Sequence, residues 1–299
     1  MTLDQLRIFV AVAERQHITR AAEALNLVQS AVSSAIATLE ARHATKLFHR
    51  VGRRIELTEA GRTFLIEARS VLARAEGAER VLADLSGMRR GTLALYGSQT
   101  IVSAWLPRHL VAFRRAYPDI AVHLAVGNTT DAADAVRVGT AELGFVEGEL
   151  DDPALASTPM AQDQLVLVVA PDHPFARATR LAPSDLLSTQ WVLREAGSGT
   201  RSTFEAALAK QGIAVTALQV MLELPSNEAV RAAVEAGGGA TVLSESIVAS
   251  ALRAGTLVRA AFDLPRREFR VLRHKERYRS RAADALLDLI TIADADPHV

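Results

Sequence analysis

The stretch AAEALNLVQSAVSSAIATLE, residues 21–40, decides the fold at the front of this chain. Its alanine-rich start is typical of a helix that ends at a break at residues 26–27, and a second helical run begins at Gln29 and continues to about His43. Two helices separated by a tight turn define a helix-turn-helix. Apolar residues at helical spacing over the first 14 residues add an earlier helix, and Thr19 is expected to cap the helix that follows it.

The second helix of this pair is expected to carry a polar, exposed face. Its apolar residues Val32, Ile36 and Leu39 recur at helical spacing and would be buried together. The opposite face near the helix N-terminus then carries Gln29, Ser30, Ser33 and Ser34. Glutamine can bind adenine edges and serine can bind several bases or phosphate, so this face suits the major groove of DNA.

A cationic hairpin follows this helix. Two short extended pieces within residues 46–57 flank a Gly-Arg-Arg tip, which predicts a two-stranded wing and a winged helix-turn-helix domain over residues 1–58. Charge runs are usually only solvated surface, but beside a helix-turn-helix they favour binding to DNA phosphates or the minor groove. The side chains expected to contact DNA in this way are Thr19, Arg50, Arg53 and Arg54.

Composition limits the remaining possibilities. The 299 residues suggest two or three domains, and 49% hydrophobic with 23% charged residues is ordinary for a globular protein. Residues 1–90 carry 14 basic and 10 acidic side chains, whereas residues 91–299 carry 20 and 24, so the front of the chain is the cationic end. The chain has no cysteine, no signal-peptide pattern at its start and no apolar run long enough to span a bilayer, so we expect a cytoplasmic protein without membrane association.

A long helix is predicted to link the front domain to the rest, over residues 59–90. Residues 58–85 contain no proline, and apolar residues recur there at alternating steps of four and three. This heptad stripe favours a two-helix dimer seam, although packing on the helix's own domain is the alternative. The stripe consists of Phe64, Ala68, Val71, Ala75, Ala78, Leu82 and Leu85, and residues 86–91 are expected to form a hinge.

Beyond Gly91 short strand-like runs alternate with helices, which predicts an α/β domain over residues 91–299. One helix is expected to follow the turn at residues 97–100 and run to Tyr117. The strand-like runs are Leu93–Tyr96, Ile120–Val126, Leu143–Val146, Leu165–Ala170, Val220–Leu224, Thr241–Leu243 and Phe269–Leu272. Four hydroxyl- and amide-rich turns precede helices there. Helix N-termini at the carboxyl ends of strands suit anions, and Arg201 adds a positive charge for a carboxylate, phosphate or sulfate. Any one turn could simply cap its helix, but together they favour a ligand pocket formed by Ser98, Gln99, Thr100, Asn128, Thr129, Ser198, Gly199, Thr200, Arg201, Ser226 and Asn227.

Motifs of enzymes do not support a catalytic reading. The sequence has no nucleophile elbow, zinc-binding helix, phosphate-binding loop or dinucleotide fingerprint. Its eight histidines show no metal-ligand spacing. We therefore expect no enzymatic activity, no metal and no cofactor.

Residues 21–40, followed by Lys46–Arg50 and Leu57–Gly61, resemble the LysR-type transcriptional regulators, and the likeness extends over essentially the whole chain. The resemblance implies a winged helix-turn-helix, a dimerisation helix and an effector domain similar to periplasmic binding proteins. Its two α/β lobes would be residues 91–163 with 266–299, and residues 164–265, joined by two crossover strands. Residues 192–201 are particularly similar to branches that regulate sulfur assimilation or carbon fixation.

Four positions depart from the family pattern. Val28 stands where a serine or threonine usually caps the recognition helix, and Ala44 takes a turn position that is usually glycine. Ser34 and Ala35 replace a frequent Arg-Gln pair, which suggests more reliance on DNA shape.

The sequence as a whole predicts an allosteric, sequence-specific regulator of transcription. Its expected partners are double-stranded promoter DNA, a small anionic effector between the lobes, further copies of itself in a dimer of dimers, and RNA polymerase. Two alternatives stay open: a solute-binding receptor, which would need export, and a ligand-processing enzyme that carries a DNA-binding domain, which would need turnover of the bound ligand. A gel shift with promoter DNA distinguishes the receptor from the regulator.

Overall fold

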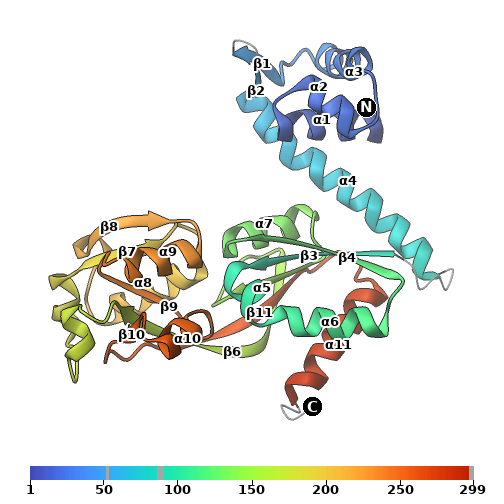
Figure 1. Ribbon diagram of the computed structural model, residues 1–299. Coiled ribbons are helices and arrows are strands. Elements are labelled where there is room, and N and C mark those ends of the chain that lie inside the picture. The colour runs from blue at the N-terminus through green and yellow to red at the C-terminus, as the bar shows by residue number, and fades with distance from the viewer. Residues whose placement is uncertain (52–53, 86–90, 296–299) are drawn as a thin grey trace. The chain divides into compact units, whose positions relative to one another are not determined.

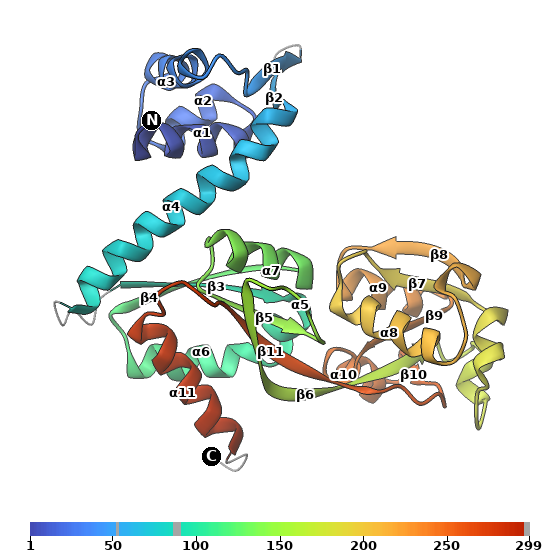
Figure 2. The same cartoon turned by 180° about the vertical axis from the view of Figure 1, so that it is seen from behind.

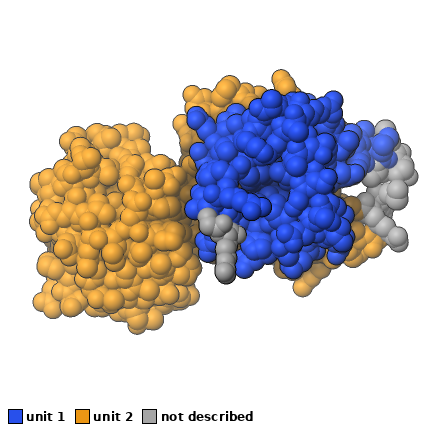
Figure 3. Space-filling model, turned by 90° about the horizontal axis from the view of Figure 1, so that it is seen from above, with its two compact units in different colours: residues 1–87, 138–140 blue, residues 88–137, 141–299 orange. Residues whose placement is uncertain are grey.

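The computed structural model describes residues 1–51, 54–85 and 91–295. The chain divides into two compact units, one of residues 1–87 with 138–140 and one of residues 88–137 and 141–299 (Figure 3). Apolar clusters form separately within each unit. Among the described residues, none of the helices combines the length and apolarity that crossing a membrane requires.

The first unit is a winged helix-turn-helix followed by a long helix, as the sequence predicts. Its core packs Leu6, Phe9 and Val12 against Val32 and Leu39. The wing strands are antiparallel. The elements are α1 (Leu3–Arg15), α2 (Ile18–Ala24), α3 (Gln29–Arg42), β1 (Phe48–Val51), β2 (Arg54–Leu57) and α4 (Glu59–Leu85) (Figure 1).

Local chemistry sets the ends of these helices. Thr2 and Gln5 form a capping box at the start of α1. The prediction that Thr19 caps α2 is wrong: His17 is the N-cap and accepts a hydrogen bond from the Arg20 N–H, while Thr19 lies within the first turn. An imidazole nitrogen can accept this bond as an amide oxygen does. Ala44 has φ 49°, a left-handed conformation that costs a non-glycine residue about 1–2 kcal/mol.

Two contacts fasten the wing to the helices. Glu40 is buried and accepts hydrogen bonds from the backbone N–H groups of Leu47 (2.9 Å) and Phe48 (3.2 Å), and it pairs with Lys46 (2.7 Å). Gly61 lies so close to the wing that a Cβ there would be 2.1 Å from the Leu47 carbonyl oxygen. Only glycine fits at that position without moving the backbone.

The long helix α4 uses its apolar stripe in two ways. Its first turns pack on their own domain, where the Phe64 ring lies 4.8 Å from that of Phe9 and Ala68 is buried. Further along, Val71 is 41% exposed and Leu82 is 68% exposed. The alternative of packing on its own domain therefore holds for the first part of the stripe. The side chain of Leu85 and the expected hinge residues 86–90 lie outside the described part of the chain.

The second unit is a two-lobed α/β domain, which confirms the predicted fold class. One sheet path runs β4-β3-β5-β11-β6-β9-β7-β8, with β10 paired to β6. Its strands are β3 (Gly91–Ser98), β4 (Ile120–Gly127), β5 (Leu143–Glu147), β6 (Leu155–Val169), β7 (Gln190–Arg194), β8 (Gln219–Leu224), β9 (Ala240–Ser244), β10 (Val258–Arg259) and β11 (Arg266–His274). The helices are α5 (Gln99–Ala104), α6 (Leu106–Ala116), α7 (Thr129–Val138), α8 (Gly199–Lys210), α9 (Asn227–Glu235), α10 (Glu245–Ala254) and α11 (Arg281–Ala295), with short 3-10 turns at Pro174–Arg177, Pro183–Ser188 and Val215–Ala217.

Strands β6 and β11 connect the lobes. β6 pairs with β11 up to Gln164 and with β9 from Leu165 onward, so the chain changes lobe at that step. The apolar clusters separate at the same place, one around β3, β5 and α11 and another around β7, β9 and α8. In the lobe that contains β3, α7 covers one face of the sheet and α6 with α11 covers the other (Figures 1 and 2).

Three parts of this domain differ from the sequence-based expectation. The helix expected after Ser98 to run to Tyr117 is two helices, because the chain breaks at Trp105 and Pro107 opens α6. Strand β7 was not predicted because both of its faces are buried and no alternation marks it. The first half of β6 is polar and contains Pro159, which also hides its strand character.

Candidate functional site

The α3 helix presents the polar face that the sequence predicts. Val32, Ile36 and Leu39 are buried in the core of the domain. The side chains of Gln29, Ser30, Ser33 and Ser34 are all exposed. Thr19 is half-buried in α2. The exposed set is therefore able to meet a partner along the N-terminal half of α3.

The wing supplies exposed positive charge next to this helix. Arg50 lies on β1 and Arg54 begins β2, and both side chains are exposed and form no ion pair with the described residues. Arg53, at the tip, lies outside the described residues. Uncompensated arginines on an exposed hairpin suit phosphate groups, because each guanidinium offers several N–H donors and a fixed charge.

The four polar turns of the second unit divide into two kinds. Ser226 accepts a hydrogen bond from the Ala229 N–H (3.0 Å), and Asn128 and Asp131 exchange bonds of 3.0 Å, so these two turns cap their helices. Ser98 and Ser198 occupy the N-cap positions of α5 and α8, yet neither hydroxyl caps its helix. Both are buried, and the Ser98 hydroxyl has no hydrogen-bond partner among the described residues. A buried hydroxyl without a partner is costly, so the Ser98 hydroxyl is able to bond a water molecule, an ion or a ligand.

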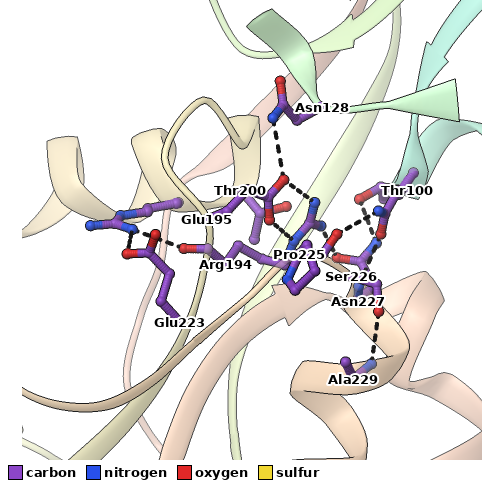
Figure 4. A network of polar contacts seen from close by, with 12 residues as sticks. Thr100, Asn128, Arg194, Glu195, Thr200, Glu223, Pro225, Ser226, Asn227 and Ala229 are labelled. Atoms are coloured by element: carbon purple, nitrogen blue, oxygen red, sulfur yellow. Dashed lines mark hydrogen bonds and ion pairs between the residues drawn. The ribbon is translucent and has the colours of Figure 1, made fainter. Parts of the chain in front are cut away.

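Turns from opposite lobes meet directly. The Gln99 side chain donates to the Pro225 carbonyl (2.7 Å) and accepts from the Asn227 N–H (3.0 Å). Asn227 in turn donates to the Thr100 hydroxyl (3.2 Å), and Asn128 donates to Glu195 (3.4 Å). These cross-lobe hydrogen bonds close one lobe on the other (Figure 4).

Arg194, at the end of β7, connects two of these contacts. Its side chain is buried, pairs with both carboxylate oxygens of Glu195 (2.7 and 2.9 Å) and also donates to the side-chain oxygen of Asn227 (Figure 4). Burial raises the pKa of Glu195, but the pair with Arg194 and the bond from Asn128 outweigh it and hold that pKa below its ordinary value. Arg194 thus couples the Asn128 contact to the Asn227 contact.

A second buried arginine lies on the crossover strand β11. Arg267 pairs with Asp163 of β6 (2.8 Å), donates to the Thr200 hydroxyl (3.1 Å) and lies 3.8 Å from Glu147. One of its terminal nitrogens has no hydrogen-bond partner among the described residues. Thr129 donates to the same Glu147 (3.1 Å). Glu147 belongs to the lobe that contains β3 and Thr200 to the other lobe, so residues of both lobes converge on Arg267.

Sequence reasoning missed Arg194 and Arg267 and favoured Arg201 as the cation for an anion. Arg201 instead pairs with Glu205 (2.7 Å) and with Glu223, and it also bonds the Arg194 carbonyl (3.0 Å). These carboxylates raise the pKa of Arg201 further and balance its charge. Arg194 and Arg267 both lie within strands, and a charged residue inside an otherwise strand-like segment is the signal that could have identified them.

A polar groove of about 600 Å³ adjoins Arg267. Gly148 and Glu149 line it from one lobe, Lys210 from the other, and residues 265–268 from the crossover. Neither Lys210 nor Arg266 forms an ion pair with the described residues. Across the described part of the chain no cluster of three histidine or acidic side chains could hold a metal ion.

An exposed polar helix in a winged domain, followed by a two-lobed α/β domain with convergent polar turns, defines a ligand-responsive DNA-binding regulator. Residues 3–62 match the bacterial regulatory helix-turn-helix proteins of the lysR family, and residues 86–293 match the LysR substrate binding domain. The chain therefore belongs to the LysR family of transcriptional regulators, which confirms the resemblance and the function drawn from the sequence.

Individual relatives support this assignment. The chain is 34% identical over 301 residues to a probable RuBisCO transcriptional regulator of Nostoc sp. strain PCC 7120, covering 99% of this chain and 89% of that one. The solved structure of CbnR, a LysR family regulator, has a TM-score of 0.70 at 22% identity and covers 99% of this chain and 100% of its own. The CcmR regulatory domain of Synechocystis PCC6803, solved in complex with 2-PG, has a TM-score of 0.62 at 28% identity and covers 68% of this chain and 97% of its own.

Proposed function

We propose that α3 contacts operator bases through Gln29, Ser30, Ser33 and Ser34, and that Thr19, Arg50, Arg53 and Arg54 contact the DNA backbone. The observation that carries this proposal is the division of α3 into a fully buried apolar face and an exposed polar face. A recognition helix needs that division, because one face must hold it on its domain while the other enters the major groove. The exposed wing arginines supply the charge for phosphates.

Arg54→Ala and Gln29→Ala separate the two roles. Because Arg54 would contact phosphate, its loss should weaken binding to every DNA sequence and lower the slope of log affinity against log salt by about 1 per protomer. Gln29→Ala should instead change base preference and leave the salt slope as it is. Fluorescence anisotropy against salt and a binding selection from random duplexes measure the two effects. An unchanged slope in Arg54→Ala contradicts the wing assignment.

We also propose that a small anionic metabolite binds between the lobes. Of the residues that the sequence predicts, the site would use Ser98, Gln99, Thr100, Asn128, Thr129, Ser198, Gly199, Thr200 and Asn227, with Lys210 and Arg266 of the adjoining groove as cations. Ser226 would serve as the helix cap and Arg201 as the partner of Glu205 and Glu223, and neither would bind the anion directly. The buried hydroxyl of Ser98, which has no hydrogen-bond partner among the described residues, supports this site, as do Lys210 and Arg266 in the adjoining groove, which form no ion pair with the described residues. The CcmR domain, which is 28% identical, binds a small molecule named 2-PG in its structure.

Ser98→Ala and Ser226→Ala form a matched pair that tests this site. A screen of sulfate, phosphate and small phosphorylated or carboxylic acids by thermal shift first identifies an anion that stabilises the full chain. At 100 times its dissociation constant such an anion adds about 2.7 kcal/mol. Ser98→Ala should leave the ligand-free protein as stable as before but remove most of the shift, whereas Ser226→Ala should lower stability by about 1 kcal/mol through the lost cap and keep the shift. Equal shifts in both variants argue against the site.

Ligand binding would act through the lobes. Closing or opening the cross-lobe contacts changes how effector domains of several protomers pack, and a coupling of about 1–3 kcal/mol is enough for a 5- to 150-fold effect on DNA binding. We propose a dimer of dimers, which the exposed Val71 and Leu82 of α4 and the exposed Val220 and Met221 of edge strand β8 support. Regulation would occur in the cytoplasm, with RNA polymerase as a further partner and without turnover of the ligand.

A further inference from the structure

Val28 stands at the start of α3 in an environment that offers it no partner. It occupies the N-cap position with φ −79° and ψ 145°, and its side chain makes no capping hydrogen bond. It is 68% exposed, and Ala31, one turn further along α3, is exposed as well. The helix therefore begins with a small apolar patch, Val28 and Ala31, beside the polar side chains of Gln29 and Ser30.

Within the folded domain this choice of residue is unfavourable twice. A serine, threonine, aspartate or asparagine at the N-cap would accept a hydrogen bond from the first turn, which valine cannot do. Most of the Val28 side chain also remains in water, so burial within the domain stabilises it little. The same domain does cap α1 with Thr2 and α2 with His17, so capping side chains are used elsewhere in it. The Val28 side chain would be buried only by a surface that α3 meets outside its own domain.

That surface follows from the proposed role of α3 as the recognition helix, on which this inference rests. The first residues of a recognition helix reach the base edges in the major groove. Only thymine displays an apolar group there, its C5 methyl, and apolar side chains bind it by excluding water from both. We propose that Val28, with Ala31 beside it, contacts a thymine methyl group in each operator half-site.

Neighbouring residues agree with this assignment. Gln29 follows Val28 directly and can bind adenine through two hydrogen bonds, so both residues favour A·T pairs at the position where α3 begins. A phosphate contact is excluded for Val28 because its side chain has neither donor nor charge. Val28 thus adds base specificity through methyl recognition, which the four polar residues of α3 cannot provide.

Deoxyuridine tests the proposal, because it pairs as thymine does but lacks the methyl group. The operator is first selected from random duplexes with the full-length protein. Each thymine of the selected duplex is then replaced by deoxyuridine, one symmetric pair at a time, and affinity is measured by fluorescence anisotropy. For the wild-type protein one pair of positions should lose about fourfold in affinity per half-site, the value of one buried methyl group. All other positions should change by less than twofold.

Three variants locate the effect on the side chain. Val28→Ser removes the methyl groups and adds a helix cap, so this variant should unfold at a higher urea concentration than the wild type. It should nevertheless bind the thymine operator more weakly. Its affinity should not change when deoxyuridine replaces thymine at the sensitive position. Val28→Thr keeps one methyl group and should show a reduced but measurable loss. Val111→Ser changes a valine that is 51% exposed on α6 and should leave the deoxyuridine profile as in the wild type.

The outcomes separate this inference from the proposed recognition helix. Sequence-specific binding that is insensitive to deoxyuridine, or a profile in Val28→Ser equal to that of the wild type, overturns the thymine contact and leaves the role of α3 intact. Failure to select any sequence from random duplexes overturns the recognition helix itself. Loss of a protein–protein interaction in Val28→Ser, with an unchanged DNA profile, would assign the patch to a protein partner and also overturn the contact with thymine.

Discussion

Glu40 is a buried carboxylate in a domain that otherwise buries apolar side chains. Burial by itself raises the pKa of Glu40, but the bond from Lys46 and the backbone N–H groups of Leu47 and Phe48 outweigh it, so the pKa lies below its ordinary value of 4.5. A carboxylate whose pKa is lowered on folding stabilises the folded domain above its ordinary pKa, and this stabilisation is lost as the pH falls through the folded-state pKa. Glu40 therefore makes the winged domain sensitive to acid.

Glu40→Gln and Glu40→Ala should expose this contribution. Glu40→Ala leaves the N–H of Leu47 buried without an acceptor and should lower the free energy of unfolding by about 1–3 kcal/mol at neutral pH. Glu40→Gln should flatten the dependence of stability on pH below about 4.5, because the remaining amide does not titrate. Urea unfolding between pH 3 and 7 measures both. Lys46→Ala is the control: its Nζ is largely exposed, so its loss should cost less than about 1 kcal/mol.

Residue-level roles in the effector domain show where sequence reasoning stops. Ser98 and Ser226 both precede a helix and look alike in the sequence. The Ser226 hydroxyl caps its helix, whereas the Ser98 hydroxyl is buried without a hydrogen-bond partner among the described residues. Arg201 has one partner that the sequence could have shown, because Glu205 lies at i,i+4 on the same helix. Its second partner, Glu223, lies 22 residues further along the chain on β8, and a contact between such distant segments carries no local pattern.

At the scale of elements, helices with one apolar face are the ones that the sequence predicts well. The periodicity of Val32, Ile36 and Leu39 is local to α3, and the structure confirms both the helix and its buried face. Strands β7 and β10 and the first half of β6 lack such a pattern and were missed. A buried central strand is defined by its neighbours on both sides, which no window of sequence contains.

Helix α4 leads to a prediction about association. Val71→Lys and Leu82→Lys change exposed positions of the stripe. Each should therefore leave the free energy of unfolding within about 0.5 kcal/mol of the wild type. If these positions form a seam with a second copy, the variants should shift the oligomer towards monomer at low micromolar concentration, as measured by analytical ultracentrifugation. Ala68→Lys, at a buried position of the same stripe, should instead unfold the winged domain. Unaltered association in both exposed variants would place the dimer contact elsewhere.

At the scale of the whole effector domain, closure of the lobes depends on few side chains. Gln99 supplies two of the cross-lobe hydrogen bonds, both to backbone groups of the lobe of residues 164–265, at Pro225 and Asn227. Because each such bond is worth about 1 kcal/mol, Gln99→Ala should shift the ligand-free domain towards an open form and reduce effector affinity about tenfold. Small-angle scattering should show a larger radius of gyration for the variant, and effector titration should show the weaker binding.

Gln164 offers the matched control for Gln99. Its side-chain amide also makes two hydrogen bonds to backbone carbonyls, those of Leu165 and Leu264, but neither joins the two lobes. Gln164→Ala should therefore lower stability without changing the scattering profile or the effector affinity. If Gln99→Ala and Gln164→Ala behave alike, the cross-lobe bonds do not control closure.

The path of the chain through β6 and β11 also determines the order in which the protein can be completed during synthesis. Ala283, Leu286 and Ile290 of α11 are fully buried against the lobe that begins with β3, and β11 lies in the middle of its sheet. That lobe cannot be completed until β11 and α11 have been synthesised, although its first strand is made before residue 100. A messenger RNA truncated before the codon for residue 266 would still encode the complete winged domain, but it would encode neither β11 nor α11. Its product would retain the DNA-binding module, but its effector domain would lack the crossover strand β11 and the helix α11 that covers the lobe containing β3.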